Sequence, residues 1–421
     1  MTLPAKSKGA KKKLTFFLAP LAPLAPLAHL FMESLMKRIL ALLIIVLLTA
    51  GYFWWRSGNE AADTNTTSLI PLLSETNTAG FAQATEADNI VFPRDLGPHN
   101  EYQTEWWYYT GNLETAEGRP FGFQLTFFRR ALTADETGGG ETASDWRTNQ
   151  IYLAHFTISD IEGDAFYPAE RFSRGAAGLA GAQANPYRVW LENWSAEAIN
   201  NEQVHLFAQT EEVRLDLTLT QTLPPILHGD GGLSPKGPEP GNASYYYSIV
   251  QQEAAGTVAV GEELFEVTGL AWKDHEYSTS ALSPGAVGWD WFSLQFDDGS
   301  ALMFFQIRQA NGRLEPASSG TYIYPDGTTR TLDREGWQLT VSDSWASPHS
   351  EAEYPAGWQI TIPELELAIE GRPLMNDQEL NVSTTYWEGA VEFTGTIGGR
   401  PVGARGYIEM TGYAEVMTGR L

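Results

Sequence analysis

From about residue 91 onward, short apolar runs alternate with turn residues, and this repeat limits the fold more than any other feature. In residues 120–130, apolar side chains occupy every odd position from 121 to 127, which is the period of a β-strand. Pro-Asp-Gly at 325–327 is a turn signal between two such runs. No stretch in this part of the sequence has helical periodicity of any length. Short strands spaced about 8–12 residues apart predict an all-β sandwich or barrel.

Residues 104–130 and 288–308 repeat one pattern. Each stretch runs from paired tryptophans through a turn glycine into an apolar strand that ends at arginine. This repeat predicts two related β-domains. The alternative is that two amphipathic hairpins have converged on the same pattern.

An apolar segment at residues 39–55 is flanked by Lys37, Arg38 and Arg56. Its length is at the short end for a membrane-spanning helix, and its last residues are aromatic, as at a membrane interface. We predict a single-pass signal anchor over residues 36–56 in the inner (cytoplasmic) membrane, with the body on the periplasmic side. A cleaved signal peptide is the alternative.

The segments on either side of this anchor differ in composition from the body. Residues 1–35 contain repeated Leu-Ala-Pro triplets. Because proline every third residue blocks a helix, we expect a disordered tail or a stretch upstream of the natural start. Residues 57–97 are largely polar, with little periodicity, and predict a flexible linker.

The charge of the chain is divided unevenly. Residues 1–56 carry eight basic residues and one acidic residue, so the remainder carries 19 basic and 51 acidic residues, a net charge of −32. A body this acidic should repel nucleic acid, and we expect no nucleic-acid partner. The absence of cysteine excludes disulfides and thiolate chemistry.

Residues 268–296 hold the densest group of reactive side chains, including Asp274, His275 and Asp290. Glu105 stands in a similar stretch earlier in the chain. An imidazole donates and accepts protons near neutral pH, and a neighbouring carboxylate can hold it protonated. These four residues are therefore candidate catalytic groups. The alternative is a satisfied, buried polar network with a structural role.

The adjacent residues Asp274, His275 and Glu276 also suggest a metal site. Successive side chains on a strand point to opposite faces, so these three cannot all bind one ion without a bulge. No cysteine and no spaced histidine pair completes a ligand set. We expect no metal. We also expect no cofactor, because no phosphate loop or nucleotide fingerprint follows any strand.

Six tryptophans lie within residues 104–130, within residues 268–296 or at position 387. Their side chains could line a cavity or fill an apolar core. They are Trp106, Trp107, Trp272, Trp289, Trp291 and Trp387. His155, in an Ala-His-Phe word, has the same two interpretations.

Several short words of the sequence together resemble one family. They are Glu-Trp-Trp-Tyr at 105–108, Phe-Gly-Phe-Gln at 121–124, Ala-His-Phe at 154–156, Ala-Trp-Lys-Asp-His-Glu at 271–276, Gly-Trp-Asp-Trp at 288–291, Tyr-Trp-Glu-Gly at 386–389 and Gly-Tyr-Ile-Glu-Met-Thr-Gly-Tyr at 406–413. With these words the sequence resembles the AttH/CrtC family, which includes carotenoid 1,2-hydratase and the lipocalin-like AttH proteins.

The resemblance implies two consecutive lipocalin-like β-barrel domains, at residues 98–278 and 279–421, after the N-terminal anchor. It also implies an apolar, isoprenoid-like ligand. The expected ligand contacts are the six tryptophans together with His155, Tyr277 and Glu388.

For the hydratase of this family, the resemblance implies a reaction in which a C=C bond is protonated. It also implies a role in that reaction for the histidine that corresponds to His275. This sequence departs from the hydratase pattern at two places. Tyr277 replaces a tryptophan, and the strand at 301–308 has neither the carboxylate nor the tyrosine. The AttH-like branch, found beside ABC-transporter genes, is therefore favoured.

We predict a membrane-anchored extracytoplasmic protein that binds, carries or processes an apolar molecule. The first alternative is a hydratase-like or hydrolase-like enzyme that transfers protons through His275 and nearby carboxylates. The second is an accessory subunit of an ABC-type transport system.

Overall fold

The computed structural model describes residues 78–134, 148–279, 282–283 and 285–417, and these residues form an all-β protein, as predicted. Their helical elements are three short 3₁₀ turns, η1 (Arg94–Leu96), η2 (Arg334–Gly336) and η3 (Pro363–Leu365). None of the helices in this described part is long and apolar enough to cross a bilayer. The anchor predicted over residues 36–56 lies outside the described residues.

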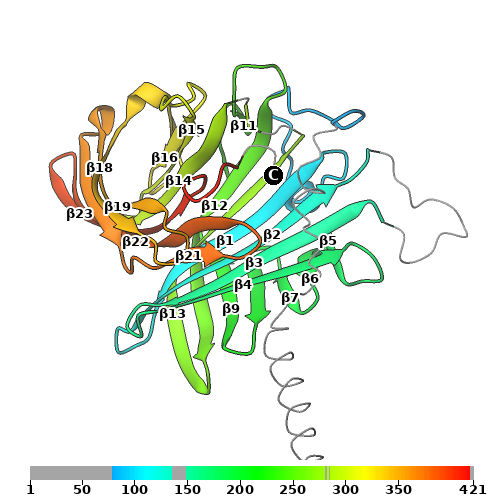
Figure 1. Ribbon diagram of the computed structural model, residues 1–421, viewed down its shortest axis with the longest axis horizontal. Coiled ribbons are helices and arrows are strands. Elements are labelled where there is room, and N and C mark those ends of the chain that lie inside the picture. The colour runs from blue at the N-terminus through cyan, green and yellow to red at the C-terminus, as the bar shows by residue number, and fades with distance from the viewer. Residues whose placement is uncertain (1–77, 135–147, 280–281, 284, 418–421) are drawn as a thin grey trace, which may run out of the picture. The chain divides into compact units, whose positions relative to one another are not determined.

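The first sheet has thirteen strands and curls into a nearly closed barrel (Figure 1). Its strands are β1 (Thr104–Glu114), β2 (Pro120–Ala131), β3 (Gln150–Asp160), β4 (Ala165–Arg174), β5 (Ala180–Ala184), β6 (Tyr187–Leu191), β7 (Trp194–Ala198), β8 (Gln203–Gln209), β9 (Val213–Gln221), β10 (Ile226–Leu227), β11 (Leu233–Pro235), β12 (Ala243–Val260) and β13 (Glu263–Ser278). The main order is β4-β3-β2-β1-β13-β12-β9-β8-β7-β6-β5, and β10 and β11 pair with β12.

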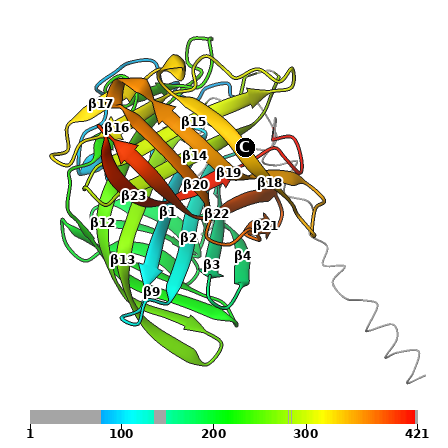
Figure 2. The ribbon, with the colours of Figure 1, turned by 90° about the vertical axis from the view of Figure 1, so that its left-hand side faces the viewer.

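The second sheet has ten strands and curves into a half-barrel, which faces the viewer in Figure 2. Its strands are β14 (Ala286–Phe296), β15 (Ala301–Gln309), β16 (Gly320–Ile323), β17 (Thr329–Leu332), β18 (Gln338–Ala346), β19 (Glu353–Ile362), β20 (Leu367–Pro373), β21 (Glu379–Asn381), β22 (Thr385–Ile397) and β23 (Arg400–Met410). The main order is β17-β16-β15-β14-β23-β22-β20-β19-β18, and β21 pairs with β22. The domain boundary expected after residue 278 falls between the two sheets.

Each sheet has an apolar core of its own, and a further apolar cluster fills the junction between them. In this cluster Tyr246 and Trp272 from the first sheet contact Trp291 from the second. Polar groups also cross the junction. The side-chain amide of Gln295 donates to the backbone carbonyl of Ala271 at 3.1 Å.

Gly122 on β2 shows how closely the two sheets approach. A Cβ atom at this position would lie 2.6 Å from the hydroxyl oxygen of Tyr407 and 2.9 Å from the Cβ of Ala390, both on the second sheet. No larger residue fits without a shift of these neighbours. The glycine in the Phe-Gly-Phe-Gln word is therefore explained by the packing of the sheets.

The side chains of β13 alternate between two faces, as the sequence predicts. Asp274 and Glu276 line a cavity at the junction of the sheets. His275 points to the opposite face, where its imidazole contacts the Glu105 carboxylate. The pairing of β1 with β13 supports this placement, because it sets Trp107 opposite His275.

Candidate functional site

A cavity of about 170 Å³, here called the junction pocket, lies between the two sheets. Its volume exceeds that of an engineered cavity of about 150 Å³ that binds benzene, so a ring-sized apolar group would fit. Both sheets contribute to its apolar walls, which include Trp106, Tyr108, Phe128, Trp289, Trp291 and Phe305.

Four carboxyl groups line the same pocket. Asp274 and Glu276 come from β13 of the first sheet, whereas Glu388 on β22 and Glu409 on β23 come from the second. Carboxyl groups in an apolar cavity resist ionisation, because burial disfavours the charged form. The pocket therefore combines aromatic walls with a group of four carboxyl side chains.

Asp274 has the most complete set of hydrogen-bond donors among the four acids. The indole of Trp272 donates to its Oδ1 at 2.7 Å, the hydroxyl of Tyr246 donates to its Oδ2 at 2.9 Å, and Ser248 also donates to Oδ1. Burial raises the pKa of Asp274, these donors oppose the shift, and the resulting pKa is about 7. At neutral pH this carboxyl can therefore both accept and release a proton.

Glu388 is the most strongly desolvated acid in the pocket wall. Both of its carboxyl oxygens are buried, and neither accepts a hydrogen bond of normal geometry from the described residues. Burial and the nearby Glu409 raise the pKa of Glu388 well above its usual range. Burial also raises the pKa of Glu409 to about 7, although the Trp289 indole donates to it at 3.2 Å. Burial and the nearby Glu409 therefore favour the neutral form of Glu388.

Glu276 differs from the other three acids because a cation neutralises it. The Lys236 ammonium lies 2.9 Å from its Oε1 and stands over the Phe305 ring. This ion pair holds the Glu276 carboxyl against a fixed partner. Lys236 lies in the Pro-rich loop before β12, and nothing in its local sequence marks it as a pocket residue.

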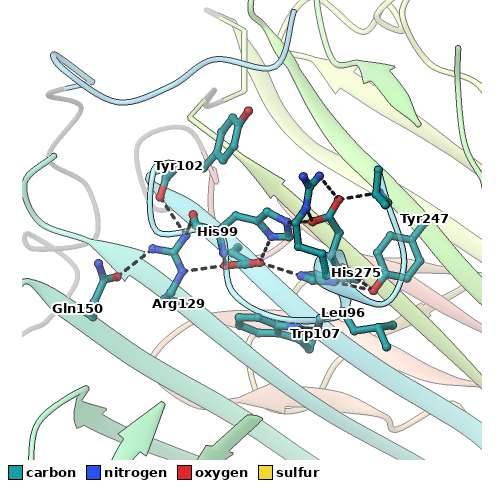
Figure 3. A network of polar contacts seen from close by, with 12 residues as sticks. Leu96, His99, Tyr102, Trp107, Arg129, Gln150, Tyr247 and His275 are labelled. Carbon is teal, nitrogen blue, oxygen red and sulfur yellow. Dashed lines mark hydrogen bonds and ion pairs between the residues drawn. The ribbon is translucent and has the colours of Figure 1, made fainter. Parts of the chain in front are cut away.

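Behind β13, Glu105 joins two histidines and an arginine in a buried network (Figure 3). Its Oε1 contacts His99 Nδ1 at 2.8 Å and His275 Nε2 at 2.8 Å. Its Oε2 accepts from Arg129 Nε at 2.9 Å. The network, here called the Glu105 cluster, consists of Glu105, His99, His275 and Arg129. Of these four residues only Arg129 also lines the junction pocket, whereas His99, Glu105 and His275 do not.

The electrostatics of the Glu105 cluster separate its two histidines. Burial lowers the pKa of His99, but the charges of Glu105 and Asp95 outweigh that effect and raise it to about 9. Burial dominates at His275 and lowers its pKa to about 4. Arg129 and His99 hold the pKa of Glu105 well below its usual range, against the effect of burial. At neutral pH the cluster thus holds an ionised glutamate, a protonated His99 and a neutral His275.

The atoms of His99, Glu105 and His275 lie close enough to ligate one metal ion. The positive charges already present in the cluster argue against a bound metal ion. A protonated His99 has no free lone pair, and the Arg129 guanidinium would repel a cation next to it. The residues therefore fit a proton-bridged network better than a metal site.

The structure places the remaining sequence-predicted residues apart from the pocket. Trp107 stacks on His275, and Tyr277 stacks on His99. Trp272 does not line the pocket, but it contacts two residues that do, Asp274 and Trp291. Trp387 is buried in the core of the second sheet.

Asp290 and His155 also lie outside the pocket lining. Asp290 pairs with Arg308 at 3.1 Å and accepts from the amide of Gln306 at 2.9 Å. His155 contacts the hydroxyl of Tyr386, which is a pocket residue, through its Nδ1 at 2.7 Å.

Sequence reasoning assigned no role to several residues that the structure brings into these sites. In the pocket these are Tyr108, Tyr246, Lys236 and Glu409, and in the Glu105 cluster they are His99 and Arg129. A signal was present at Glu409, a single acid between Ile408 and Met410 in an apolar strand. His99 carried no such signal, because it precedes β1 in a loop-like stretch.

The fold and the pocket define a lipocalin-like β-protein with a ligand-sized cavity between two sheets. A family model described as AttH-like matches residues 83–413, and the chain therefore belongs to the AttH-like family, as its sequence words predict. No match was found among curated protein sequences.

Two solved structures are similar to this chain. One, described as an AttH from Nitrosomonas europaea, is 34% identical, covers 79% of this chain and 100% of its own, and has a TM-score of 0.69. The other is kievitone hydratase from Nectria haematococca, which is 14% identical, covers 81% of this chain and 98% of its own, and has a TM-score of 0.60. The second likeness concerns the fold alone.

Proposed function

We propose that the chain binds an apolar molecule in the junction pocket and catalyses the addition of water to a carbon–carbon double bond, or the reverse elimination. The observation that carries this proposal is the neutral, buried acid Glu388 in an aromatic cavity that also holds Asp274. An alkene is a weak base, so its protonation needs a desolvated acid placed against it. A pocket that only carried a ligand would not need four acids.

In the proposed reaction, Glu388 gives its proton to one alkene carbon, and the π electrons form the new C–H bond. The neighbouring carbon becomes a carbocation, which the faces of the Trp106 and Trp291 rings stabilise. A water oxygen then bonds to this carbon while Asp274 takes a proton from the water. The product is an alcohol, and one turnover leaves Glu388 ionised and Asp274 protonated.

This assignment differs from the role expected for His275. The imidazole of His275 lies on the other face of β13 and contacts Glu105 and Tyr247 rather than the pocket. In the proposal His275 and Glu105 support the wall that holds Asp274. The kievitone hydratase structure indicates only that a fold of this kind is compatible with hydratase activity in another protein.

The test compares molecules extracted from the full-length wild-type chain and from its E388Q variant, both purified from the same host and analysed by mass spectrometry. We expect the variant to retain an alkene and the wild type to hold or release the same molecule with one water added. E364Q, at an exposed ion pair with Arg330, is the matched control. An identical, unaltered molecule in all three proteins would support a carrier instead. No molecule in any of them would favour the accessory role.

We also propose a membrane location, which the apolar character of residues 39–55 and their basic flanks support. In this proposal the anchor holds the acidic body at the outer face of the inner membrane, where apolar molecules partition. Components of an ABC transporter are the proposed protein partners, by family resemblance. Protease added to intact spheroplasts should digest the body, and protection of the body would contradict this location.

A further inference from the structure

The hydroxyl of Tyr386 joins the pocket to a chain of polar groups that leads to the protein surface. Tyr386 lines the junction pocket on β22, and Glu388 stands two residues further along the same strand, hence on the same face. Beyond Tyr386, His155 Nδ1 lies 2.7 Å from its hydroxyl oxygen. The other ring nitrogen of His155 lies 3.1 Å from Glu170 Oε2.

Only the outermost of these groups reaches the surface. Tyr386 and His155 are both buried, whereas the side chain of Glu170 is 22% exposed. Ser383 donates a hydrogen bond to Glu170 and holds it in place at the rim. The chain of contacts crosses the junction of the sheets, because His155 lies on β3 and Tyr386 on β22.

Glu388 needs a route of this kind if it acts as a proton donor. Its two oxygens are buried and shielded from bulk solvent. After each turnover the acid must nevertheless regain the proton that it gave to the substrate. The Tyr386 hydroxyl is an adjacent group that can supply one, because Tyr386 and Glu388 lie two residues apart on the same face of β22 and both line the junction pocket.

We propose that Tyr386, His155 and Glu170 form a proton path that connects Glu388 to bulk water, an inference that rests on the proposed function of Glu388. Inward transfer moves one proton at each contact. Glu170 passes a proton to His155 Nε2, His155 Nδ1 passes its proton to the Tyr386 oxygen, and Tyr386 passes its own proton to the Glu388 carboxylate. One proton enters the path at Glu170 and one proton reaches Glu388, so the charges of His155 and Tyr386 are unchanged after the transfer. Rotation of the hydroxyl and a tautomer change at His155 reset the path.

The test follows the carbonyl stretch of the protonated Glu388 carboxyl by infrared spectroscopy after rapid mixing of the full-length protein into D₂O. The band is assigned as the one that E388Q removes. In Y386F and H155F we expect its deuterium shift to slow by about 100-fold, the lower end of what a positioned proton-transfer group contributes. Added imidazole should restore the rate in H155A, where the ring has left a space.

Y354F and H205F are the matched controls. Tyr354 is a buried tyrosine of the same sheet whose hydroxyl donates to Glu379, and His205 is a partly exposed histidine paired with Asp216. Both should exchange at the wild-type rate. Circular dichroism establishes that each variant is folded, and H155Q replaces H155F if the latter does not fold.

The outcomes separate this inference from the function on which it rests. Wild-type exchange rates in Y386F and the His155 variants would overturn the proton path but leave Glu388 as a neutral acid. If E388Q removes no carboxylic-acid band, Glu388 is ionised, and both the path and the proposed hydration mechanism are wrong. Slow exchange in Y386F and the His155 variants, with rescue by imidazole in H155A, supports the path.

Discussion

Asp274 and His275 are neighbours in the chain, yet their side chains lie on opposite faces of β13 and contact different residues. The Asp274 carboxyl lines the junction pocket and accepts a hydrogen bond from the Tyr246 hydroxyl. The His275 ring contacts Glu105 on the opposite face of the strand. One strand thus connects the junction pocket with the Glu105 cluster. A substitution of Asp274 should therefore affect the proposed chemistry, whereas a substitution of His275 should affect the stability of the fold.

The first prediction concerns the hydrogen bond from Tyr246 to Asp274. This bond lowers the pKa of Asp274, so Y246F should raise that pKa above its value of about 7. We expect an upward shift of about 0.5–1 unit. Carbon-13 NMR of protein labelled at the aspartate carboxyls would measure it, with D274N to assign the signal and Y354F as the control. An unchanged or lower pKa would show that the bond does not set the proton affinity of Asp274.

The second prediction concerns the buried ion pair of Arg129 with Glu105. Both side chains are fully buried, so R129M leaves an ionised carboxylate without its main partner. We expect a loss of about 3–5 kcal/mol in the free energy of unfolding, measured in urea. The control is R405M, at the Arg405–Glu114 pair, where both side chains are about half exposed. That variant should lose less than about 1 kcal/mol. Equal losses of unfolding free energy in R129M and R405M would contradict the expectation that breaking a buried ion pair costs more than breaking an exposed one.

The third prediction concerns the pH dependence that His99 gives to folding. Its pKa is about 9 in the folded protein and 6.5 when unperturbed. Because the folded value is the higher one, its stabilisation is complete below pH 6.5 and is lost as the pH rises through 9. The stability difference between wild type and H99Q should therefore shrink by about 3 kcal/mol over that interval. Urea unfolding of both proteins across this range is the measurement, and a difference that does not change with pH would refute it.

The fourth prediction concerns the close approach of the sheets at Gly122. An added Cβ meets Tyr407 and Ala390, so G122A should destabilise the protein by about 1–3 kcal/mol. G336A is the control, because its Cβ would meet its nearest neighbour at an ordinary 3.6 Å. The double variant G122A/Y407F should recover part of the loss, since it removes the nearer clash. Thermal unfolding of all three variants distinguishes packing at the junction from a general effect of alanine.

Local pattern was enough to predict the strands and the faces of their side chains. The alternation around His275 placed Asp274 and Glu276 together, and the turn before residue 120 was placed correctly between β1 and β2. Residues 180–184 carry no such pattern, because alanine and glycine are poor strand formers. The structure nevertheless has β5 (Ala180–Ala184) there, stabilised by its pairing with β6.

The site itself depended on contacts that no local pattern contains. His99 and His275 are 176 positions apart, and they approach one another because both contact the single carboxylate of Glu105. The contact between His155 and Tyr386 likewise depends on how two sheets pack. Such contacts follow from tertiary packing rather than from periodicity. The sequence words therefore contained many of these residues without showing which ones would meet.

The pocket acids are divided between the two halves of the chain, Asp274 and Glu276 in one and Glu388 and Glu409 in the other. Neither half therefore contains all four acids, and the cavity is complete only when the two sheets have packed together. In the proposed function, activity therefore begins with assembly, and a truncated or misdocked chain would be inert.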